Sequence, residues 1–275
     1  MSLLNKILDQ TKPVKDFLDK EISENIYPDN NLIKSMRYTL LADGKRLRPW
    51  LVLTSAEICG AKYEDAIRVA GAIECIHRYS LIHDDLPCFD DDKERWGIPT
   101  NHMIFNENTA IIAGDSLQSK AFEIISNEKT HKDPSTRCKL INLLSNYIGH
   151  LGMCGGQEID TQMEQGKLPI TEDLMVRNQI MKTGALFKFS CSAGCLLGDN
   201  SPKKLELLEK YAYHLGLLFQ MTDDLLDKDG FMHIWTSEKL RSEIEKHSIE
   251  AQNSARELGS EEMYSLIEIL KKRTY

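Results

Sequence analysis

Carboxylates crowd one short stretch of the chain, where five aspartates fall within nine positions directly after an apolar helical run. They are Asp84, Asp85, Asp90, Asp91 and Asp92. Like charges at this density repel one another and are costly to bring together unless cations neutralise them. Carboxylate oxygens suit Mg²⁺, which is usually held by one or two carboxylates together with substrate phosphates. The stretch therefore predicts a magnesium site for a diphosphate, with a solvated acidic loop as the competing interpretation.

A second acidic cluster far downstream favours the metal-site interpretation. Asp223, Asp224 and Asp227 also end an apolar helical run. On an α-helix Asp223 and Asp227 lie four residues apart and therefore share a face. In the first cluster, Pro87 removes a backbone donor and disfavours helix at Leu86. The helix should end there, so that the later aspartates turn back toward the first pair.

Helical periodicity dominates the rest of the chain, and runs typical of β-strands are hard to find. We expect helices near residues 2–24, 30–42, 48–59, 63–86, 106–127, 134–152, 171–197 and 202–227, with another pair between 236 and 273. Asp133-Pro134, Thr171 and Ser201-Pro202 provide capping side chains and helix-starting prolines. The sequence contains neither an internal repeat nor a linker, so we expect one all-α domain over residues 1–275.

Composition excludes several classes of function. The formal net charge of −8 argues against the basic surface that nucleic acid or an anionic membrane requires. No stretch reaches the roughly 18 apolar residues of a membrane span, and Lys6 and Asp9 interrupt the N-terminal apolar run, so we expect a soluble protein. The seven cysteines contain no CxxC pair and suit a reducing cytoplasm.

The two aspartate motifs, DDLPCFD from Asp84 to Asp90 and DDLLD from Asp223 to Asp227, resemble those of the trans-polyprenyl diphosphate synthases. The first motif is closest to that of the bacterial short-chain farnesyl diphosphate synthases. The resemblance runs almost continuously to Asp227 and implies an isoprenoid-synthase-type helical bundle around a deep central cavity. It also implies a set of Mg²⁺ ligands, namely Asp84, Asp85, Asp90, Asp223, Asp224 and Asp227.

A compact basic turn, GKRLRP from Gly44 to Pro49, is the next candidate substrate site. Its cations could close on a phosphate or merely join two helices. The resemblance assigns Lys45 and Arg48 to the diphosphate of isopentenyl diphosphate. His77 joins them in the bacterial enzymes, and it precedes Asp84 by seven residues, an offset of about 20° after two helical turns.

Further contacts with the allylic substrate are implied by other motifs. A lysine, a β-branched residue and a glycine all cost stability within a helix, so the run Lys182-Thr183-Gly184 indicates function. The resemblance gives Lys182, Thr183 and Arg95 a role at the allylic diphosphate, and Gln220 a contact with the allylic group near the cation. The segment from Gly155 to Asp160 resembles a GQxxD motif that lines the cavity, although by itself it would be interpreted as a helix interruption.

Two departures from the family pattern affect the prediction. The family normally has two arginines before Gly97, and here the second is Trp96, which has one N–H donor and no charge. After Asp227 the chain is apparently shortened, because the lysine-bearing loop of relatives has no counterpart. These changes predict weak or absent synthase activity, with Mg²⁺-dependent binding of the allylic diphosphate retained. Replacing Trp96 with arginine is expected to improve the KM for isopentenyl diphosphate more than that for the allylic substrate.

The leading prediction is a Mg²⁺-dependent prenyltransferase that condenses dimethylallyl or geranyl diphosphate with isopentenyl diphosphate to farnesyl diphosphate. Tyr79 and Ser80 lie four to five residues before Asp84, where bulk would limit the growing chain; the alternative is that Tyr79 is ordinary core. The resemblance also implies a cytoplasmic homodimer. The remaining alternatives are a weakly active or non-catalytic synthase-like subunit, a geranyl or geranylgeranyl diphosphate synthase, and a terpene cyclase-like enzyme, which the basic turn disfavours.

Overall fold

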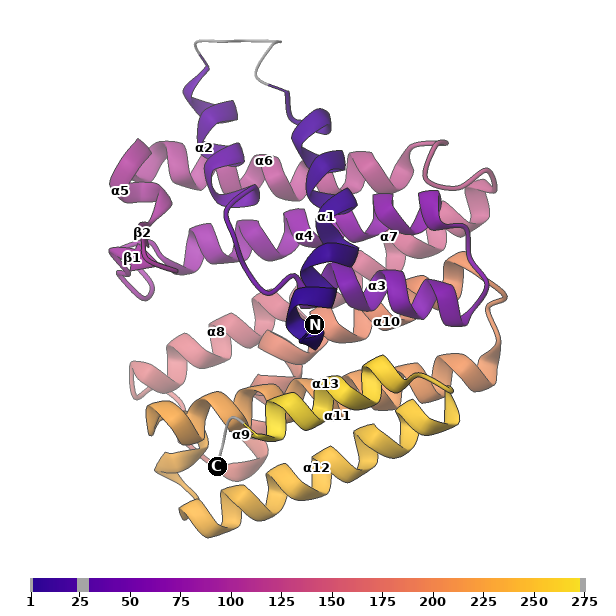
Figure 1. Cartoon of the computed structure of the whole chain (residues 1–275). Helices are drawn as coiled ribbons and strands as arrows, with labels where there is room; N and C mark the ends of the chain where they lie inside the picture. The colour runs from indigo at the N-terminus through magenta and orange to yellow at the C-terminus, as the bar shows by residue number, and fades with distance from the viewer. Residues whose placement is uncertain (1, 24–29, 273–275) are drawn as a thin grey trace. The chain divides into compact units, whose positions relative to one another are not determined.

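A computed structural model describes residues 2–23 and 30–272 of the chain (Figure 1). The chain divides into two compact units. Unit 1 consists of Met1–Leu53 and Lys62–Ile141, and unit 2 of Thr54–Ala61 and Asn142–Tyr275. The chain crosses between the units three times, from Leu53 to Thr54, from Ala61 to Lys62 and from Ile141 to Asn142.

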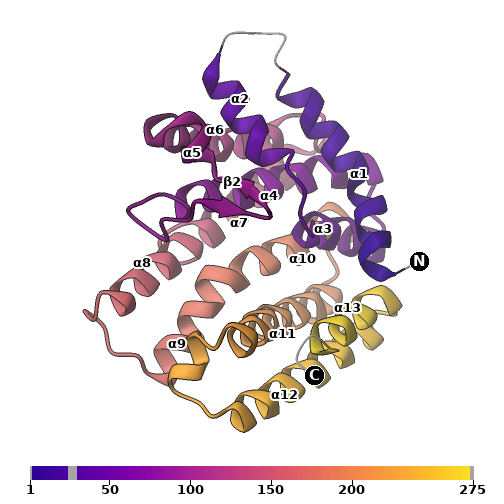
Figure 2. The same cartoon turned by 60° about the vertical axis from the view of Figure 1, so that its left-hand side comes forward.

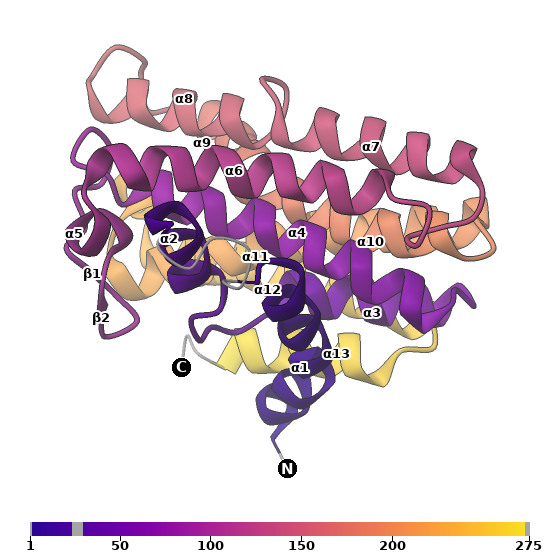
Figure 3. The ribbon, with the colours of Figure 1, turned by 90° about the horizontal axis from the view of Figure 1, so that it is seen from above.

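Unit 1 is organised around one long buried helix, α4. Its elements are α1 (Leu3–Glu21), α2 (Asn31–Leu40), the first part of α3 (Leu47–Ile58), α4 (Tyr63–Asp84), β1 (Glu94–Arg95), β2 (Ile98–Pro99), α5 (Asn101–Phe105), α6 (Glu107–Ser126) and the first part of α7 (Pro134–Ile148). Residues 69–76 of α4 are buried on every face, as expected of a helix that is apolar all round. Figure 3 shows α4 beside α6, and α1 packs against α4 as well.

Unit 2 is organised around the longest helix, α11. Its elements are α8 (Met153–Glu164), α9 (Glu172–Gln179), the π-helical turn η2 (Ile180–Gly184), α10 (Ala185–Leu197), α11 (Pro202–Asp227), the 3₁₀ helix η3 (Gly230–His233), α12 (Ser237–Glu257) and α13 (Glu261–Lys272). Helix α11 packs against both α10 and α12, and α13 covers α12 and α11 (Figure 2). The polar helix α12 therefore buries one face against α11.

Capping side chains begin the helices where the sequence predicts. Asp133 accepts hydrogen bonds from the backbone N–H groups of Ser135 and Thr136, at 3.0 and 3.2 Å, at the start of α7. Thr171 caps α9, and Ser201 caps α11 ahead of Pro202. A capping oxygen satisfies N–H groups that have no partner within the helix, so these local signals are sufficient to set the boundaries.

The all-α prediction is confirmed, since all regular secondary structure in the described residues is helical apart from the two-residue strands β1 and β2. Several details were wrong. The prediction lacked α5, the β1–β2 hairpin and α8, and it extended α7 to residue 152 although the helix ends at Ile148. It also made residues 171–197 one α-helix, where the structure has the turn η2.

Residues 24 and 273, at the ends of two predicted helices, lie outside the described residues. Within the described ranges, no helix combines the length and the apolar character that crossing a bilayer requires. The grouping of residues 1–275 into one domain stays a prediction.

Candidate active site

The first aspartate motif forms a turn immediately after α4. The helix ends at Asp84, and the backbone N–H of Asp90 donates to the Asp84 carbonyl at 2.9 Å. The N–H of Asp91, at a φ of 53°, donates to the carbonyl of Leu86. The chain thus turns back on the end of its own helix, and the predicted effect of Pro87 is confirmed.

The aspartates of this turn have different environments. Asp84 is half-buried and Asp90 exposed, whereas Asp85 is buried and 2.6 Å from Nη2 of Arg95. Arg95 also donates from Nε to Asp85 at 2.7 Å and from Nη2 to Asp92 at 3.0 Å. Burial raises the pKa of Asp85, and its bond to Arg95 opposes that rise. Arg95 is therefore held at the turn by Asp85.

The basic turn and the predicted histidine meet within unit 1. Nη1 of Arg48 lies 3.3 Å from Nε2 of His77 on α4. Arginine has only donors, so this ring nitrogen accepts and the proton of the neutral ring is on Nδ1. Burial and the nearby Arg48 hold the pKa of His77 well below its ordinary value. Lys45 is exposed on the same turn, so Arg48 meets His77 as predicted and Lys45 lies three residues before Arg48 along the chain.

A buried charge cluster lies beneath the basic turn, and sequence reasoning missed it. Glu74 on α4 is 1% exposed and accepts hydrogen bonds from Arg46 and, at 2.6 Å, from Nε of Arg78. Burial alone would raise the pKa of Glu74, but the two guanidinium groups lower it to about 2. The spacing of Glu74 and Arg78, one turn apart within an apolar helix, was the available signal.

The chain-length candidates lie on α4 between His77 and the first aspartate motif. Tyr79 is buried, and its ring meets that of His83 edge to face, with the centroids 5.7 Å apart. Ser80 is half-buried and donates to the backbone carbonyl of His77 at 2.9 Å. Tyr79 is the bulkier of the two and lies five residues before the end of the helix.

In unit 2, the GQxxD segment and the Lys-Thr-Gly segment lie against each other. A Cβ on Gly156 would lie 2.3 Å from the backbone nitrogen of Lys182, so only glycine permits α8 to approach η2 so closely. Lys182 forms an ion pair with Asp160, which also accepts from Asn178 at 2.7 Å. Asp160 therefore orients the lysine that was predicted to contact the allylic diphosphate.

A chain of hydrogen bonds links η2 to the second aspartate motif. Thr183 donates to Oε1 of Gln220 at 3.3 Å, and Nε2 of Gln220 donates to Asp224 at 2.7 Å. The other oxygen of Asp224 accepts from the backbone N–H of Phe231 at 2.9 Å. Burial raises the pKa of Asp224 to about 6. Asp224 therefore holds together the end of α11 and η3, a role that the sequence did not indicate.

The other two aspartates of this motif are more accessible. Asp223 is half-buried and Asp227 exposed, one turn apart on α11. Beneath them, a Cβ on Gly216 would lie 2.9 Å from the Cα of Gly184, so α11 and η2 are also in close backbone contact. The structure thus brings Lys182, Thr183, Gln220 and the second aspartate motif to one region of unit 2.

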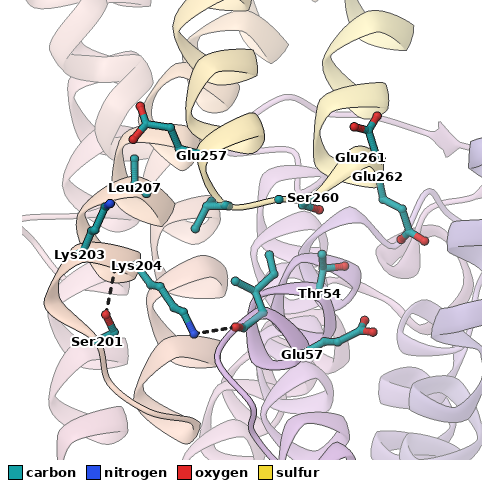
Figure 4. Close-up of a pocket in the computed structure, with 13 residues that line it drawn as sticks. Thr54, Glu57, Ser201, Lys203, Lys204, Leu207, Glu257, Ser260, Glu261 and Glu262 are labelled. Atoms are coloured by element: carbon teal, nitrogen blue, oxygen red, sulfur yellow. Dashed lines mark hydrogen bonds between the residues drawn. The ribbon is translucent and has the colours of Figure 1, made fainter.

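A separate groove of unit 2 contains none of these residues among those that line it. Its volume is about 620 Å³, and it lies among the end of α3, the start of α11 and the connection from α12 to α13 (Figure 4). Lys204 crosses it to donate to the carbonyl of Ile58 at 2.9 Å, and glutamates such as Glu57 and Glu261 also line it. The groove has no part in the candidate active site.

Each unit combines an acidic motif with cationic side chains, and comparison with known proteins gives the family. Residues 29–232 match the family model described as polyprenyl synthetase. The farnesyl diphosphate synthase of Bacillus subtilis is 39% identical over 229 residues, which are 83% of this chain and 76% of that protein. The geranylgeranyl diphosphate synthase of Cyanophora paradoxa is 40% identical over 248 residues, which are 89% and 79% of the two chains.

A solved structure is similar over almost the whole chain. The crystal structure of an FPP/GFPP synthase from Zymomonas mobilis, without ligand, matches with a TM-score of 0.92 and 37% identity, covering 97% of this chain and 98% of that one. The chain belongs to the polyprenyl synthetase family. Every residue predicted for the site lies within the matched range 29–232.

Proposed function

We propose that the protein is a prenyltransferase that condenses dimethylallyl or geranyl diphosphate with isopentenyl diphosphate and releases farnesyl diphosphate. The observation that carries the proposal is that each unit, taken by itself, gathers carboxylates and cationic side chains of the kinds that suit Mg²⁺ and a diphosphate. Unit 1 places the first aspartate turn and the Arg48–His77 pair at one end of α4. Unit 2 gathers Lys182, Gln220 and the second aspartate motif around η2. Similarity to farnesyl diphosphate synthases supports the same activity.

The chemistry of the donor set fits Mg²⁺. The half-buried or exposed carboxylates Asp84, Asp90, Asp223 and Asp227 offer the hard oxygen ligands that Mg²⁺ requires. When bound, Mg²⁺ supplies Lewis-acid neutralisation of the leaving diphosphate. Asp85 and Asp224 have protein partners of their own, and we propose that they mainly hold the two motifs in shape.

The side chains of this protein bind and orient both substrates in the proposed reaction. Lys182 and Arg95 provide fixed positive charge where negative charge develops as the allylic C–O bond breaks. Lys45, Arg48 and His77 hold the diphosphate of isopentenyl diphosphate so that its alkene lies next to the allylic carbon. The alkene attacks, a C–C bond forms, and the proton lost from the isopentenyl unit goes to the departing diphosphate. No side chain is required as the base.

The test is incubation of the purified chain with Mg²⁺, dimethylallyl diphosphate and labelled isopentenyl diphosphate, with products resolved by chain length. We expect a product of 15 carbons and none after chelation of the metal, because the carboxylates alone would repel the diphosphate. Absence of any condensation product, with allylic diphosphate still bound, would instead identify a non-catalytic synthase-like subunit. The Trp96 replacement is the observation that favours this second candidate.

The proposal also concerns the length of the product, which we propose is limited by Tyr79. Its buried ring on α4 is proposed to stop chain growth at 15 carbons. Tyr79→Ala should shift the products to 20 carbons or more, measured by chromatography, while Tyr79→Phe should leave them unchanged. If Tyr79→Ala gives the same products, Tyr79 is ordinary core. A 20-carbon main product of the unmodified chain would favour a geranylgeranyl diphosphate synthase, as the similarity to the Cyanophora protein allows.

We further propose that the protein acts as a cytoplasmic homodimer. All seven cysteines are present as thiols, which suits a reducing compartment. Helices α5 and α6 expose four large apolar side chains, which are Met103, Ile104, Ile111 and Ile112 at 42–52%. Apolar patches of this kind mark interfaces. Light scattering should give twice the mass of the chain, and Ile112→Lys should reduce it.

A further inference from the structure

The indole of Trp96 covers a buried guanidinium. The Cζ of Arg78 lies 4.5 Å from the centroid of the Trp96 ring. Trp96 has a φ of 55° and Gly97 a φ of 79°, in the two-residue turn that joins β1 to β2. A bulky residue at positive φ is strained. The contact with Arg78 offsets the backbone strain of a tryptophan at this positive φ.

On its other sides Arg78 holds the basic turn. Its Nη2 donates to the backbone carbonyls of Ala42 and Asp43, at 3.2 and 3.4 Å. A Cβ on Gly44 would lie 2.8 Å from the same nitrogen, so the backbone rests directly on the guanidinium. Lys45 follows immediately along the chain. The position of this turn relative to α4 therefore depends on where the Arg78 side chain is held.

Charge balance explains why an aromatic cover matters. Glu74 is one carboxylate between two guanidinium groups, those of Arg46 and Arg78, and all three side chains are at most 8% exposed. One positive charge of this cluster is left without a buried counter-charge, and an uncompensated buried charge is costly. The electron-rich face of an indole stabilises such a cation, most of all where water is excluded.

We propose that Arg78 and Trp96 form a positioning pair that holds the Lys45–Arg48 turn ready for the diphosphate of isopentenyl diphosphate. The inference rests on the proposed function. It changes the interpretation of Trp96. The tryptophan supports the substrate-binding turn through Arg78, and is more than the loss of a phosphate-binding arginine. An arginine at position 96 would face the guanidinium of Arg78. The predicted benefit of Trp96→Arg is therefore reversed as long as Arg78 is present.

The experiment measures isopentenyl diphosphate binding by calorimetry, together with KM and kcat for each substrate. Arg78→Met should weaken isopentenyl diphosphate binding about tenfold, with kcat and the allylic KM nearly unchanged, because a small misplacement of binding groups is costly. The matched control is Arg68→Met, on the same helix. Arg68 also lies over an aromatic ring, that of Phe17 at 5.0 Å, and pairs with Glu21 at 3.4 Å. It should lower stability without changing either substrate constant.

Substitutions at position 96 test the pair directly. Trp96→Phe keeps an aromatic face and should bind isopentenyl diphosphate nearly as well as the unmodified chain. Trp96→Arg should weaken binding, but adding Trp96→Arg to Arg78→Met should weaken it no further, because without Arg78 there is no like-charge contact. Such non-additivity is the signature of two residues in contact.

Two results would overturn the inference. One is equal isopentenyl diphosphate affinity for Arg78→Met and Arg68→Met; the other is tighter binding by Trp96→Arg alone. Failure of the proposed function is a separate observation, since a chain that binds isopentenyl diphosphate but forms no product still tests the pair by calorimetry. An unmodified chain that does not bind isopentenyl diphosphate rejects both.

Discussion

In unit 1, buried carboxylates accept hydrogen bonds from guanidinium groups, whereas in unit 2 the buried carboxylate of Asp224 accepts them from uncharged donors. Glu74 accepts from Arg46 and Arg78, and Asp85 from Arg95. The pKa of Glu74 falls to about 2 although burial opposes it, so Glu74 stays ionised. Breaking such a pair leaves a buried cation unpartnered.

Unit 2 shows the opposite arrangement. The carboxylate of Asp224 accepts hydrogen bonds from the amide of Gln220 and from the N–H of Phe231, and burial raises its pKa to about 6. His214 and His247 share a hydrogen bond of 2.7 Å between their Nδ1 atoms. Burial and the neighbouring ring lower the pKa of His214 to about 4. The difference teaches that Glu74, deep in unit 1, is stabilised by charged partners, whereas Asp224 and His214 of unit 2 have uncharged ones, so these groups should respond differently to substitution and to pH.

Substitution of the more accessible aspartates Asp84 and Asp223 should have the same effect in both units. Asp84 and Asp223 each precede a buried aspartate, and both are proposed to bind the same kind of metal group. Asp84→Ala and Asp223→Ala should each lower kcat/KM roughly 10³-fold, because several kcal/mol of charge stabilisation are lost. Asp92→Ala, which affects a carboxylate already bonded to Arg95, should cost far less. Steady-state kinetics with saturating Mg²⁺ give the comparison, and equal losses in all three variants would show that the ligands are misassigned.

Isosteric amide substitutions should separate the two units most clearly in stability. Glu74→Gln removes the charge between two buried guanidinium groups and should lower the free energy of unfolding by about 3 kcal/mol at pH 7. Asp224→Asn replaces a carboxylate whose ionised form is disfavoured by burial, so it should cost less than about 1 kcal/mol at pH 8. Urea unfolding measures both.

The cost of Glu74→Gln should also depend on pH. The folded-state pKa of Glu74, about 2, lies below its ordinary value of 4.5, so its stabilisation is present above pH 4.5 and is lost as the pH falls toward 2. The difference between the variant and the unmodified chain should therefore shrink between pH 5 and pH 3. A difference that stays constant across this range, or a larger cost for Asp224→Asn, would contradict the contrast between the units.

The smallest expected effect is the acid sensitivity of unit 2. The pKa of His214 falls from 6.5 to about 4 on folding, so the stabilisation by the neutral ring is lost as the pH falls from 6.5 toward 4. Lys210 and Lys246 also lower this pKa, while Glu250 opposes them. After allowance for partial exposure, the loss between pH 7 and pH 5 should be about 1 kcal/mol.

Hydrogen exchange can show which helices lose stability at acidic pH. Amides of α11 and α12 should exchange faster at pH 5 after correction for the intrinsic rates, while those of α4 should not. The variant His214→Gln should remove most of the difference in unit 2. Uniform loss of protection in both units would show that His214 is not its source.

The features that sequence predicted well are those with local causes. Pro87 ends α4 whatever surrounds it, and Ser201 with Pro202 starts α11, because a missing donor and a capping oxygen act within one turn. Arg48 and His77 were placed together because helical spacing set the face of the histidine and the resemblance supplied its partner. Most residues of the candidate site could therefore be proposed from the family pattern and from local chemistry.

The features that sequence reasoning missed have distant causes. Gly155 and Gly156 looked like helix breakers, but both lie within α8, and the backbone of η2 leaves no room for a side chain at Gly156. Trp96 looked like the loss of a cation because its partner, Arg78, lies on another element and is reached only through the folded chain. Asp224 looked like a third metal ligand, and only the position of Phe231 shows its other use.

The turn η2 has a consequence for the rotational phase of the helices on either side. An α-helix advances 100° per residue, and a π turn accommodates one additional residue within it. The flanking segments α9 and α10 can thus keep a common buried side while Lys182 reaches Asp160 on α8 and Thr183 reaches Gln220 on α11. Deleting one residue of Ile180–Gly184 would leave a regular helix with its buried side unchanged. The contact of Lys182 with Asp160 or that of Thr183 with Gln220 would then be lost.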